Sequence, residues 1–468
     1  MAVLVDAAAI MLTIWQLALR EIMIIVAVGV FLSGLDDLLI DVIYFTRIGW
    51  RRLTVYRRYT RASAESIRGS DPGSIAIIVP AWDESAVIGA MLGDLVNRLD
   101  YPRYRVFVGL YPNDPAGQAA VMAVADHHIQ PVICTRPGPT TKADCLNHLW
   151  RAVVAHERSS GDVFKAVVLH DAEDVVHPQE LWIFDALVPR LALVQLPVLP
   201  LPDAGSRWIS GHYLDEFAES HTKDMVVREA LGAAVPSAGV ATAIDRQRLG
   251  QIADAAGGEP FDADCLTEDY ELGLRVKALG GRGGLVRLRS GADRVMVATH
   301  EHFPATFEAA RRQKTRWLIG IGLAGWDRLG WPGGWADRYM LMRDRKALLT
   351  ALLTIAAYGV TGLYLLGGIV DFVLPSLPAL PFGAGLVALL WINTAFLAWR
   401  LLLRAGFVAH AYGPVEGLRA IPRAMVSNVI NAAAALAAAR RYRALLAGDA
   451  LLAWDKTAHR FPGESAAL

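Results

Sequence analysis

The chain carries three long apolar runs that contain no charged side chain, at residues 22–35, 347–370 and 382–399. A helix of about 24 residues is about 36 Å long, which is enough to cross the hydrocarbon core of a bilayer. The second and third runs are joined by a short Pro-rich connection that holds Pro375, Pro378 and Pro381. This pattern predicts a transmembrane hairpin, with a buried pair of soluble helices as the alternative. We expect three transmembrane helices, the first preceded by an amphipathic segment at 7–19.

Basic residues cluster beside these runs, at Arg47, Arg51, Arg52, Arg57, Arg58, Arg61, Arg343, Arg345, Lys346, Arg400 and Arg404. Because basic residues flank membrane spans on the cytoplasmic side, we expect the middle of the chain in the cytosol. We therefore expect a protein that crosses a membrane several times. The Ala-rich stretch 425–439 is followed by arginines. At fifteen residues it is predicted to be too short to span the bilayer, so we expect it to lie in the membrane interface.

Between residues 71 and 330 the pattern changes to short β-rich runs that alternate with helical stretches. The predicted strands are 75–80, 104–110, 132–134 and 165–170, and the predicted helices are 86–98, 115–127 and 142–156. Such alternation predicts an α/β fold with a Rossmann-like, mainly parallel sheet. Residues 320–325 (GIGLAG) match a dinucleotide-binding pattern. They follow a helical stretch instead of opening a βα turn, so we assign these glycines to helix packing.

Polar clusters follow three of the predicted strands, at residues 83–85 (DES), 113–114 (ND) and 170–174 (HDAED). In parallel sheets, ligands bind beyond the carboxyl ends of the strands, so these clusters predict a binding site at one edge of the sheet. The three carboxylates of HDAED repel one another. Either solvent and basic neighbours or a bound cation must relieve that cost.

Composition narrows the class of partner. The 468 residues are 54% hydrophobic and have a formal net charge of zero, which gives no sign of a nucleic-acid partner. The three cysteines, Cys134, Cys145 and Cys265, lack the spacing of a metal site and are interpreted as reduced thiols.

Six motifs occur in order along the middle of the chain: 75–85 (IAIIVPAWDES), 113–114 (ND), 142–147 (KADCLN), 171–174 (DAED), 267–269 (TED) and 313–317 (QKTRW). Together they resemble the motif set of membrane-bound family 2 glycosyltransferases with a GT-A fold, the group that contains cellulose and hyaluronan synthases. Residues 326–331 (WDRLGW) and 454–462 (WDKTAHRFP) resemble a narrower group of this family, the bacterial phage-adsorption glycosyltransferases.

The resemblance implies a metal site. Asp171 and Glu173, with Asp174 adjacent, are expected to bind Mg²⁺ or Mn²⁺, which would neutralise a diphosphate leaving group. Glu173 stands where the family has an aspartate, so whether Glu173 or Asp174 is the ligand stays open. Without the other motifs, a solvated acidic loop would be the simpler interpretation.

The resemblance also implies a nucleotide-sugar site, formed by Pro80, Glu84, Asp114, Lys142 and Asp171. Two of these residue types have ordinary structural explanations. An aspartate is common in a turn, and a lysine is common at the start of a helix.

The catalytic residues implied by the resemblance are Asp269, Gln313, Arg316 and Trp317. Asp269 is expected to be the general base of an inverting displacement, although acids are ordinary in a first helical turn. Gln313, Arg316 and Trp317 are spaced to share one helix face. Arg316 would face the diphosphate, Trp317 would stack on the acceptor sugar, and Gln313 would donate a hydrogen bond to that sugar. An amphipathic helix at the membrane surface is the alternative.

We therefore expect four parts. They are an N-terminal amphipathic segment, transmembrane helix and basic linker at 1–70, a GT-A domain at 71–330, a transmembrane hairpin at 331–405 and a helical interfacial or cytosolic segment at 406–468. The expected function is metal-dependent, inverting transfer of a sugar from a nucleoside-diphosphate sugar, preferably a UDP sugar, to a growing polysaccharide or lipid-linked acceptor. Membrane lipids and an export partner or a second copy are expected partners. The alternative is a non-catalytic membrane scaffold or phage-adsorption component.

Overall fold

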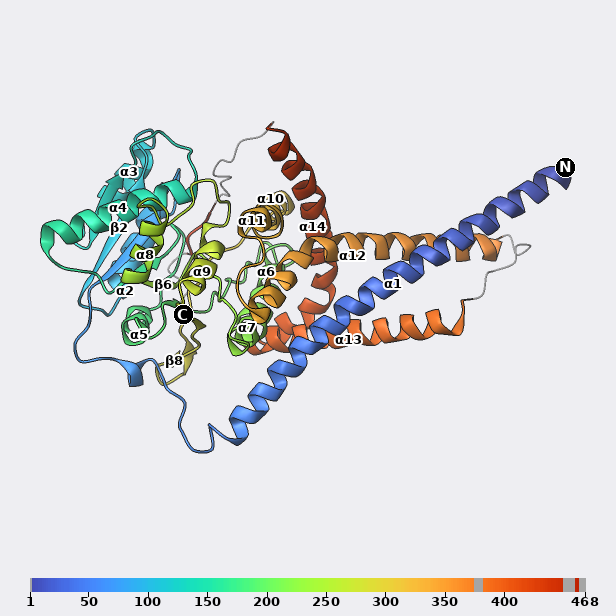
Figure 1. Ribbon diagram of the computed structural model, residues 1–468, viewed down its shortest axis with the longest axis horizontal. Coiled ribbons are helices and arrows are strands. Elements are labelled where there is room, and N and C mark those ends of the chain that lie inside the picture. The colour runs from blue at the N-terminus through green and yellow to red at the C-terminus, as the bar shows by residue number, and fades with distance from the viewer. Residues whose placement is uncertain (1, 374–381, 449–458, 463–468) are drawn as a thin grey trace.

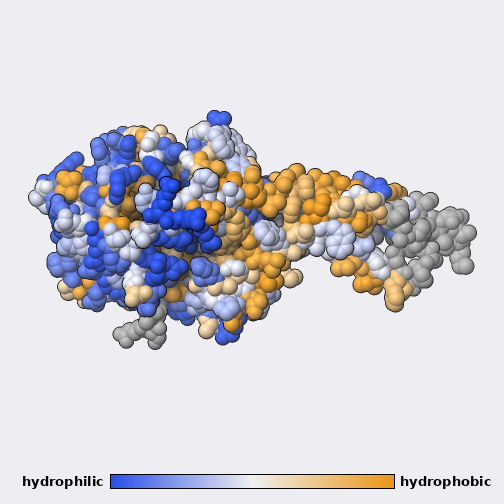
Figure 2. Space-filling view, turned by 90° about the horizontal axis from the view of Figure 1, so that it is seen from below, coloured by the Kyte–Doolittle hydropathy of each residue, from blue (hydrophilic) through white to orange (hydrophobic). Residues whose placement is uncertain are grey.

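The computed structural model describes residues 2–373, 382–448 and 459–462. A sheet domain lies at one end of the molecule, and long helices extend from it at the other end (Figure 1). On the face shown in Figure 2, hydrophilic residues cover most of the sheet domain and hydrophobic residues cover the extending helices. This division is expected of a water-facing domain attached to helices that could span a membrane.

The sheet has seven strands in the order β3-β2-β1-β4-β6-β5-β7, and neighbouring strands are parallel except where β6 pairs with β4 and β5. The strands are β1 Ile75–Pro80, β2 Tyr104–Leu110, β3 Ile129–Ile133, β4 Ala166–Leu169, β5 Leu193–Gln195, β6 Thr242–Asp245 and β7 Gly283–Leu285. The side chains of the central strands β1 and β4 are buried on both faces, as expected when helices cover a parallel sheet. The predicted mainly parallel α/β sheet is confirmed.

Helices cover both faces of this sheet. They are α2 Ile88–Arg98, α3 Pro115–Met122, α4 Lys142–Ser160, α5 Glu180–Leu187, α6 Gly211–Glu219, α7 Met225–Ala230, α8 Arg246–Ala255, α9 Glu268–Ala278, α10 Phe307–Trp317 and α11 Ala324–Leu329. Two π-helical segments, η2 Ser220–Asp224 and η3 Leu318–Leu323, continue α6 and α10. A short 3-10 turn, η1 Glu65–Ile67, and a two-stranded ribbon of β8 Arg289–Ser290 and β9 Val295–Met296 complete the domain.

Within the described residues, four helices are long and apolar enough to cross a membrane. They are α1 Ala2–Leu53, α12 Trp335–Val373, α13 Ala384–Tyr412 and α14 Pro414–Ala447. This is one more candidate than the three transmembrane helices expected from the sequence, and the number that span a membrane stays a prediction. The prolines expected in the hairpin turn lie outside the described residues.

Two helix predictions at the ends of the chain are corrected. The segments expected at 7–19 and 22–35 belong to one continuous helix, α1. The stretch expected at 425–439 is part of the 34-residue α14, which contains Pro422. In Figure 1 α14 runs across α12 and α13 instead of along them, and it packs against α6, α10, α12 and α13. Its placement in the membrane interface stays a prediction.

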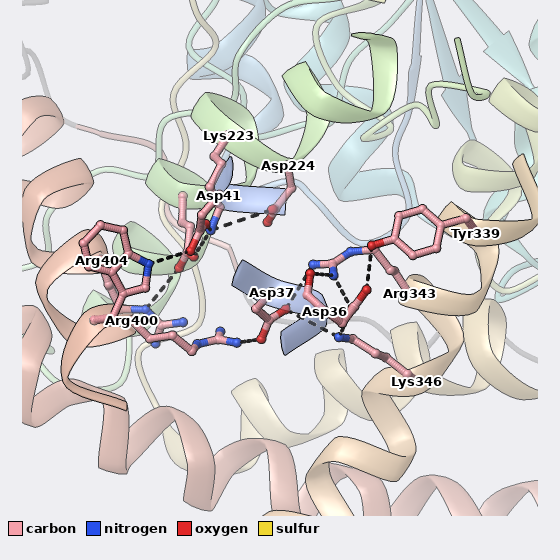
Figure 3. A network of polar contacts seen from close by, with 12 residues as sticks. Asp36, Asp37, Asp41, Lys223, Asp224, Tyr339, Arg343, Lys346, Arg400 and Arg404 are labelled. Carbon is pink, nitrogen blue, oxygen red and sulfur yellow. Dashed lines mark hydrogen bonds and ion pairs between the residues drawn. The ribbon is translucent and has the colours of Figure 1, made fainter. Parts of the chain in front are cut away.

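A network of charges joins the long helices to the sheet domain (Figure 3). Asp36 and Asp37 of α1 pair with Arg343 and Lys346 of α12, and Asp37 also pairs with Arg400 of α13. A second group centres on Lys223 of η2, whose Nζ lies 2.7 Å from Asp41 Oδ1 and 2.8 Å from Glu219 Oε1. These contacts fix the sheet domain against α1, α12 and α13.

Candidate active site

One cleft at the carboxyl edge of the sheet collects most of the residues expected to be functional. It is lined by Pro80, Glu84, Lys142, Asp171, Glu173, Asp269, Gln313, Arg316 and Trp317. Pro80 ends β1, Lys142 begins α4, Asp171 and Glu173 follow β4, Asp269 lies in the first turn of α9, and the last three lie on α10. Asp114 and Asp174 do not line this cleft.

Asp174 is bound to a buried histidine behind the cleft. His170 Nδ1 lies 2.6 Å from Asp174 Oδ2, and His170 Nε2 lies 2.6 Å from Glu180 Oε1. Burial alone would lower the pKa of His170, but Glu180 and Asp174 raise it to about 10. The imidazolium therefore offsets part of the negative charge of these two carboxylates. Asp174 also accepts a hydrogen bond from the Asp171 N–H at 3.1 Å. Asp174 thus holds the acidic loop in place, while Asp171 and Glu173 face the cleft.

Glu173 lies among other acids in the cleft. Burial raises its pKa to about 8, the positive charge of His459 opposes that rise, and Asp171, Glu84 and Asp174 add to it. His459 Nδ1 lies 3.0 Å from Glu84 Oε1 and 3.2 Å from Glu173 Oε1. A cation between these carboxylates is therefore stabilising.

Lys142 and Asp171 form a close pair at the base of the cleft, with Nζ 2.5 Å from Oδ1. Burial would lower the pKa of Lys142, but Asp171, Glu268 and Asp269 raise it above its ordinary value. Lys142 therefore carries a fixed positive charge. It is placed between the acidic loop after β4 and the start of α9.

Asp114 has a structural role beside the cleft. It is the N-cap of α3, where Oδ1 accepts from the Gly117 N–H at 3.0 Å, and its Oδ2 accepts from the Asp83 N–H at 3.0 Å. Asp83 has a positive φ of 54° and belongs to the turn that carries Glu84. Asp114 thus fixes the conformation of that turn.

Asp269 is half-buried and lies close to the backbone of Gly239. Burial raises its pKa, while Lys142 and a hydrogen bond from the Tyr270 N–H lower it. Gly239 has a φ of +82°, and a Cβ built there would lie 2.5 Å from Asp269 Oδ2. Glycine is therefore required at this position both for its backbone conformation and for the room it leaves the carboxylate.

The α10 side of the cleft combines polar and aromatic groups. Gln313 Oε1 is buried and has no hydrogen-bond partner among the described residues. Trp317 packs edge-on against Tyr213 at a centroid distance of 6.2 Å, and Phe217 and Phe303 extend this aromatic wall into the cleft. An unpartnered acceptor beside an aromatic wall suits a ligand that has both hydroxyl groups and a flat apolar face.

Two charged residues of the cleft were missed by sequence reasoning. Glu301 lines it from between His300 and His302, and burial raises its pKa well above the usual range. The spacing of the two histidines drew attention to that stretch, but not to the acid between them. His459 belongs to the motif at 454–462, and nothing in the sequence indicated that this histidine lines the site.

Fold and site together define a GT-A protein, a mainly parallel α/β domain with acids at the carboxyl edge of its sheet. The profile described as "Glycosyltransferase like family 2" matches residues 72–320, and the chain therefore belongs to the family 2 glycosyltransferases. It is 40% identical over 470 residues to "Bacteriophage adsorption protein B" of Escherichia coli strain K12 and to "Bacteriophage N4 adsorption protein B" of Escherichia coli O157:H7. The match covers 96% of this chain and 63% of each relative, so the chain spans less than two thirds of their length.

The narrower resemblance to phage-adsorption proteins is thus confirmed as a similarity. Among solved structures, the chain is similar to the mannosyltransferase PcManGT of Pyrobaculum calidifontis, in complex with GDP-Man and Mn²⁺. The TM-score is 0.52 at 17% identity, with 88% of this chain and 99% of that chain covered. At that identity the likeness concerns the fold alone.

Proposed function

We propose that this protein transfers a sugar, with inversion, from a nucleoside-diphosphate sugar to a growing polysaccharide or a lipid-linked acceptor. We further propose that it does so at the cytosolic face of the bacterial inner membrane. The observation that carries the proposal is the shared cleft of Lys142, Asp171, Glu173, Asp269 and Arg316. A UDP sugar is our preferred donor, with a GDP sugar as the alternative because PcManGT is described in complex with GDP-Man.

The residues divide the reaction between them. The acceptor hydroxyl attacks the anomeric carbon, Asp269 takes its proton, and the bond from that carbon to the diphosphate oxygen breaks with its electron pair on the diphosphate. A carboxylate whose pKa is raised by burial is suited to take that proton. Lys142 and Arg316 supply fixed positive charge near the departing diphosphate.

A divalent cation fits the acidic side of the cleft, because the carboxylates of Asp171 and Glu173 are hard oxygen ligands and Glu173 already attracts the cationic His459. We propose Asp171 and Glu173 as its ligands, with Mg²⁺ and Mn²⁺ both suited to the donor set. When bound, the cation neutralises negative charge that develops on the diphosphate.

The general-base assignment is tested with Asp269→Asn. The asparagine is nearly isosteric but cannot take a proton, so transfer should fall by about 10²- to 10⁴-fold. Release of nucleoside diphosphate is measured with a panel of UDP and GDP sugars, and donor binding should persist. A variant as fast as the parent would contradict the assignment. No turnover by the parent protein with any donor would favour the scaffold alternative.

The metal assignment is tested by comparing Glu173→Gln with Asp174→Asn. Removing a ligand should weaken Mn²⁺ binding and raise the Mn²⁺ concentration needed for transfer. Asp174→Asn should instead lower the thermal unfolding midpoint, because His170 loses a buried partner. Mn²⁺ titration followed by electron paramagnetic resonance separates the two outcomes. Equal Mn²⁺ affinity of Glu173→Gln and the parent would exclude Glu173 as a ligand.

A further inference from the structure

A second cavity of about 360 Å³ lies directly behind the cleft. Its walls come from α1, α10, η3, α12, α13 and α14. Trp317 lines both this cavity and the cleft, so the two spaces adjoin at its side chain. A group bound in the cavity would therefore lie next to the acceptor side of the cleft.

The cavity has an excess of positive charge. Five cationic side chains line it, against three carboxylates, which are Asp37, Glu216 and Asp344. Each of these acids already has partners. Asp37 pairs with cations of α12 and α13, Glu216 pairs with Lys314, and Asp344 accepts from Arg228 at 2.9 Å.

Arg345 lines the cavity and pairs with none of these acids. It is 6% exposed, it forms no ion pair within the described residues, and its Nε and Nη1 have no hydrogen-bond partner there. Trp326 and Trp331 hold the guanidinium, with their ring centroids 5.2 and 4.5 Å from Cζ. These two nitrogens are enclosed, and a buried guanidinium without a counter-charge is costly. A phosphate in the cavity that Arg345 lines would supply that charge.

The rest of the cavity wall points to an occupant with an apolar part. Leu318, Ile321, Ala347 and Ala351 line it, and α1, α12 and α13 extend away as helices that could span a membrane. We propose that the cavity binds the phosphate group of a membrane lipid, with Arg345 as the principal donor. The polar end of that lipid then lies beside Trp317, where it serves as the acceptor or carries the acceptor sugar.

This assignment rests on the proposed function and specifies its acceptor as a lipid phosphate. It also explains why an uncompensated arginine persists at the boundary between the sheet domain and the long helices. The phosphate supplies the missing negative charge.

Native mass spectrometry of the full chain in detergent, with a polyprenyl phosphate and the matching polyprenol as probes, tests the proposal. We expect the phosphate lipid to bind at least about tenfold more tightly than the polyprenol, as charge-assisted hydrogen bonds predict. Arg345→Gln should remove that preference, and Arg345→Lys should keep part of it. Arg338→Gln, an exposed arginine of the same helix that does not line the cavity, is the matched control and should bind like the parent.

Equal affinity for the two lipids would overturn the proposal. So would an Arg345→Gln variant with the same unfolding temperature and the same lipid affinity as the parent. So would displacement of the lipid by millimolar inorganic phosphate, because the site would then hold a free anion. Donor binding, measured on the same samples, separates a failure of the proposed lipid site from a failure of the proposed function. Transfer to a soluble acceptor without a phosphate preference refutes only the lipid site, whereas specific lipid binding without any donor binding refutes only the proposed function.

Discussion

The charged residues in and behind the cleft form two groups with different roles. Behind the cleft, His170 lies between Asp174 and Glu180, and its positive charge offsets part of theirs in the interior. In front, Asp171 and Glu173 face the open space with Lys142 and His459 as neighbours. The HDAED cluster could be recognised from sequence as needing positive charge. The sequence did not show that His170, the first residue of the motif, supplies part of this charge, because only the fold brings Glu180 next to His170.

Gly239 offers a test of how closely the proposed base is held. Gly239→Ala places a Cβ 2.5 Å from Asp269 Oδ2 and strains a backbone with φ of +82°. The strain should cost about 1–3 kcal/mol. Apart from this loss of stability, the rate of sugar transfer should fall by more than tenfold, because the Asp269 carboxylate must move. Thermal unfolding and nucleoside-diphosphate release measure the two effects.

Gly232→Ala is the matched control, because Gly232 has a φ of +73° with nothing within 4 Å of the added Cβ. It should share the loss of stability and keep transfer near the parent rate. Equal transfer by the two variants would mean that the Asp269 carboxylate does not depend on the space at Gly239.

At the scale of elements, the continuous segment α10–η3 connects the two halves of the site. Its last α-helical turn carries Gln313, Arg316 and Trp317, and η3 then packs against the start of α9, where Asp269 lies. The contact is tight at Gly320, where an added Cβ would lie 2.5 Å from both Thr267 Oγ1 and Cγ2. Gly320 therefore serves helix packing, as the sequence indicated.

Gly320→Ala should separate η3 from α9 and shift Arg316 and Trp317 relative to Asp269. We expect transfer to fall by about tenfold or more, since small misplacement of reacting groups is costly. Gly93→Ala, a helical glycine of α2 with no atom within 4 Å of the added Cβ, is the control and should be neutral or slightly stabilising. Steady-state kinetics with donor and acceptor varied separately would show a change in kcat. Unchanged kcat in Gly320→Ala would show that the packing does not set the catalytic geometry.

Elements were predictable where the pattern is local. The apolar runs at β1 and β2 were predicted to the residue, because buried parallel strands are continuous apolar segments bounded by polar turns. The length of α14 was not, because Pro422 and Arg423 interrupt its apolar pattern. Arg423 is fully buried, with Asp215 Oδ1 and Glu416 Oε2 each 2.6 Å away, and only the fold supplies Asp215. His459 was missed for the same reason, since its partners are distant in sequence.

At the scale of the whole molecule, buried charges join a water-facing domain to long apolar helices. Lys223 is 4% exposed and lies between Asp41 of α1 and Glu219 of α6, and Asp41 also accepts from Trp399 of α13 at 2.9 Å. A joint made of ion pairs is directional, so it holds the domain in one orientation relative to the helices.

Lys223→Met tests this joint. The methionine fills much of the space but leaves two buried carboxylates without their shared cation, which should cost about 3–5 kcal/mol. Arg103→Met is the control, because Arg103 pairs with Asp162 at 3.0 Å on an exposed surface and should cost less than about 1 kcal/mol. Thermal unfolding in detergent measures the difference. Limited proteolysis adds a second readout, since a loosened joint should expose the segment between α1 and β1 to cleavage while the sheet domain stays intact. If Lys223→Met unfolds at the same temperature as Arg103→Met, the orientation of the domain is maintained by the packing of α6, α13 and α14, and the ion pairs of η2 contribute little.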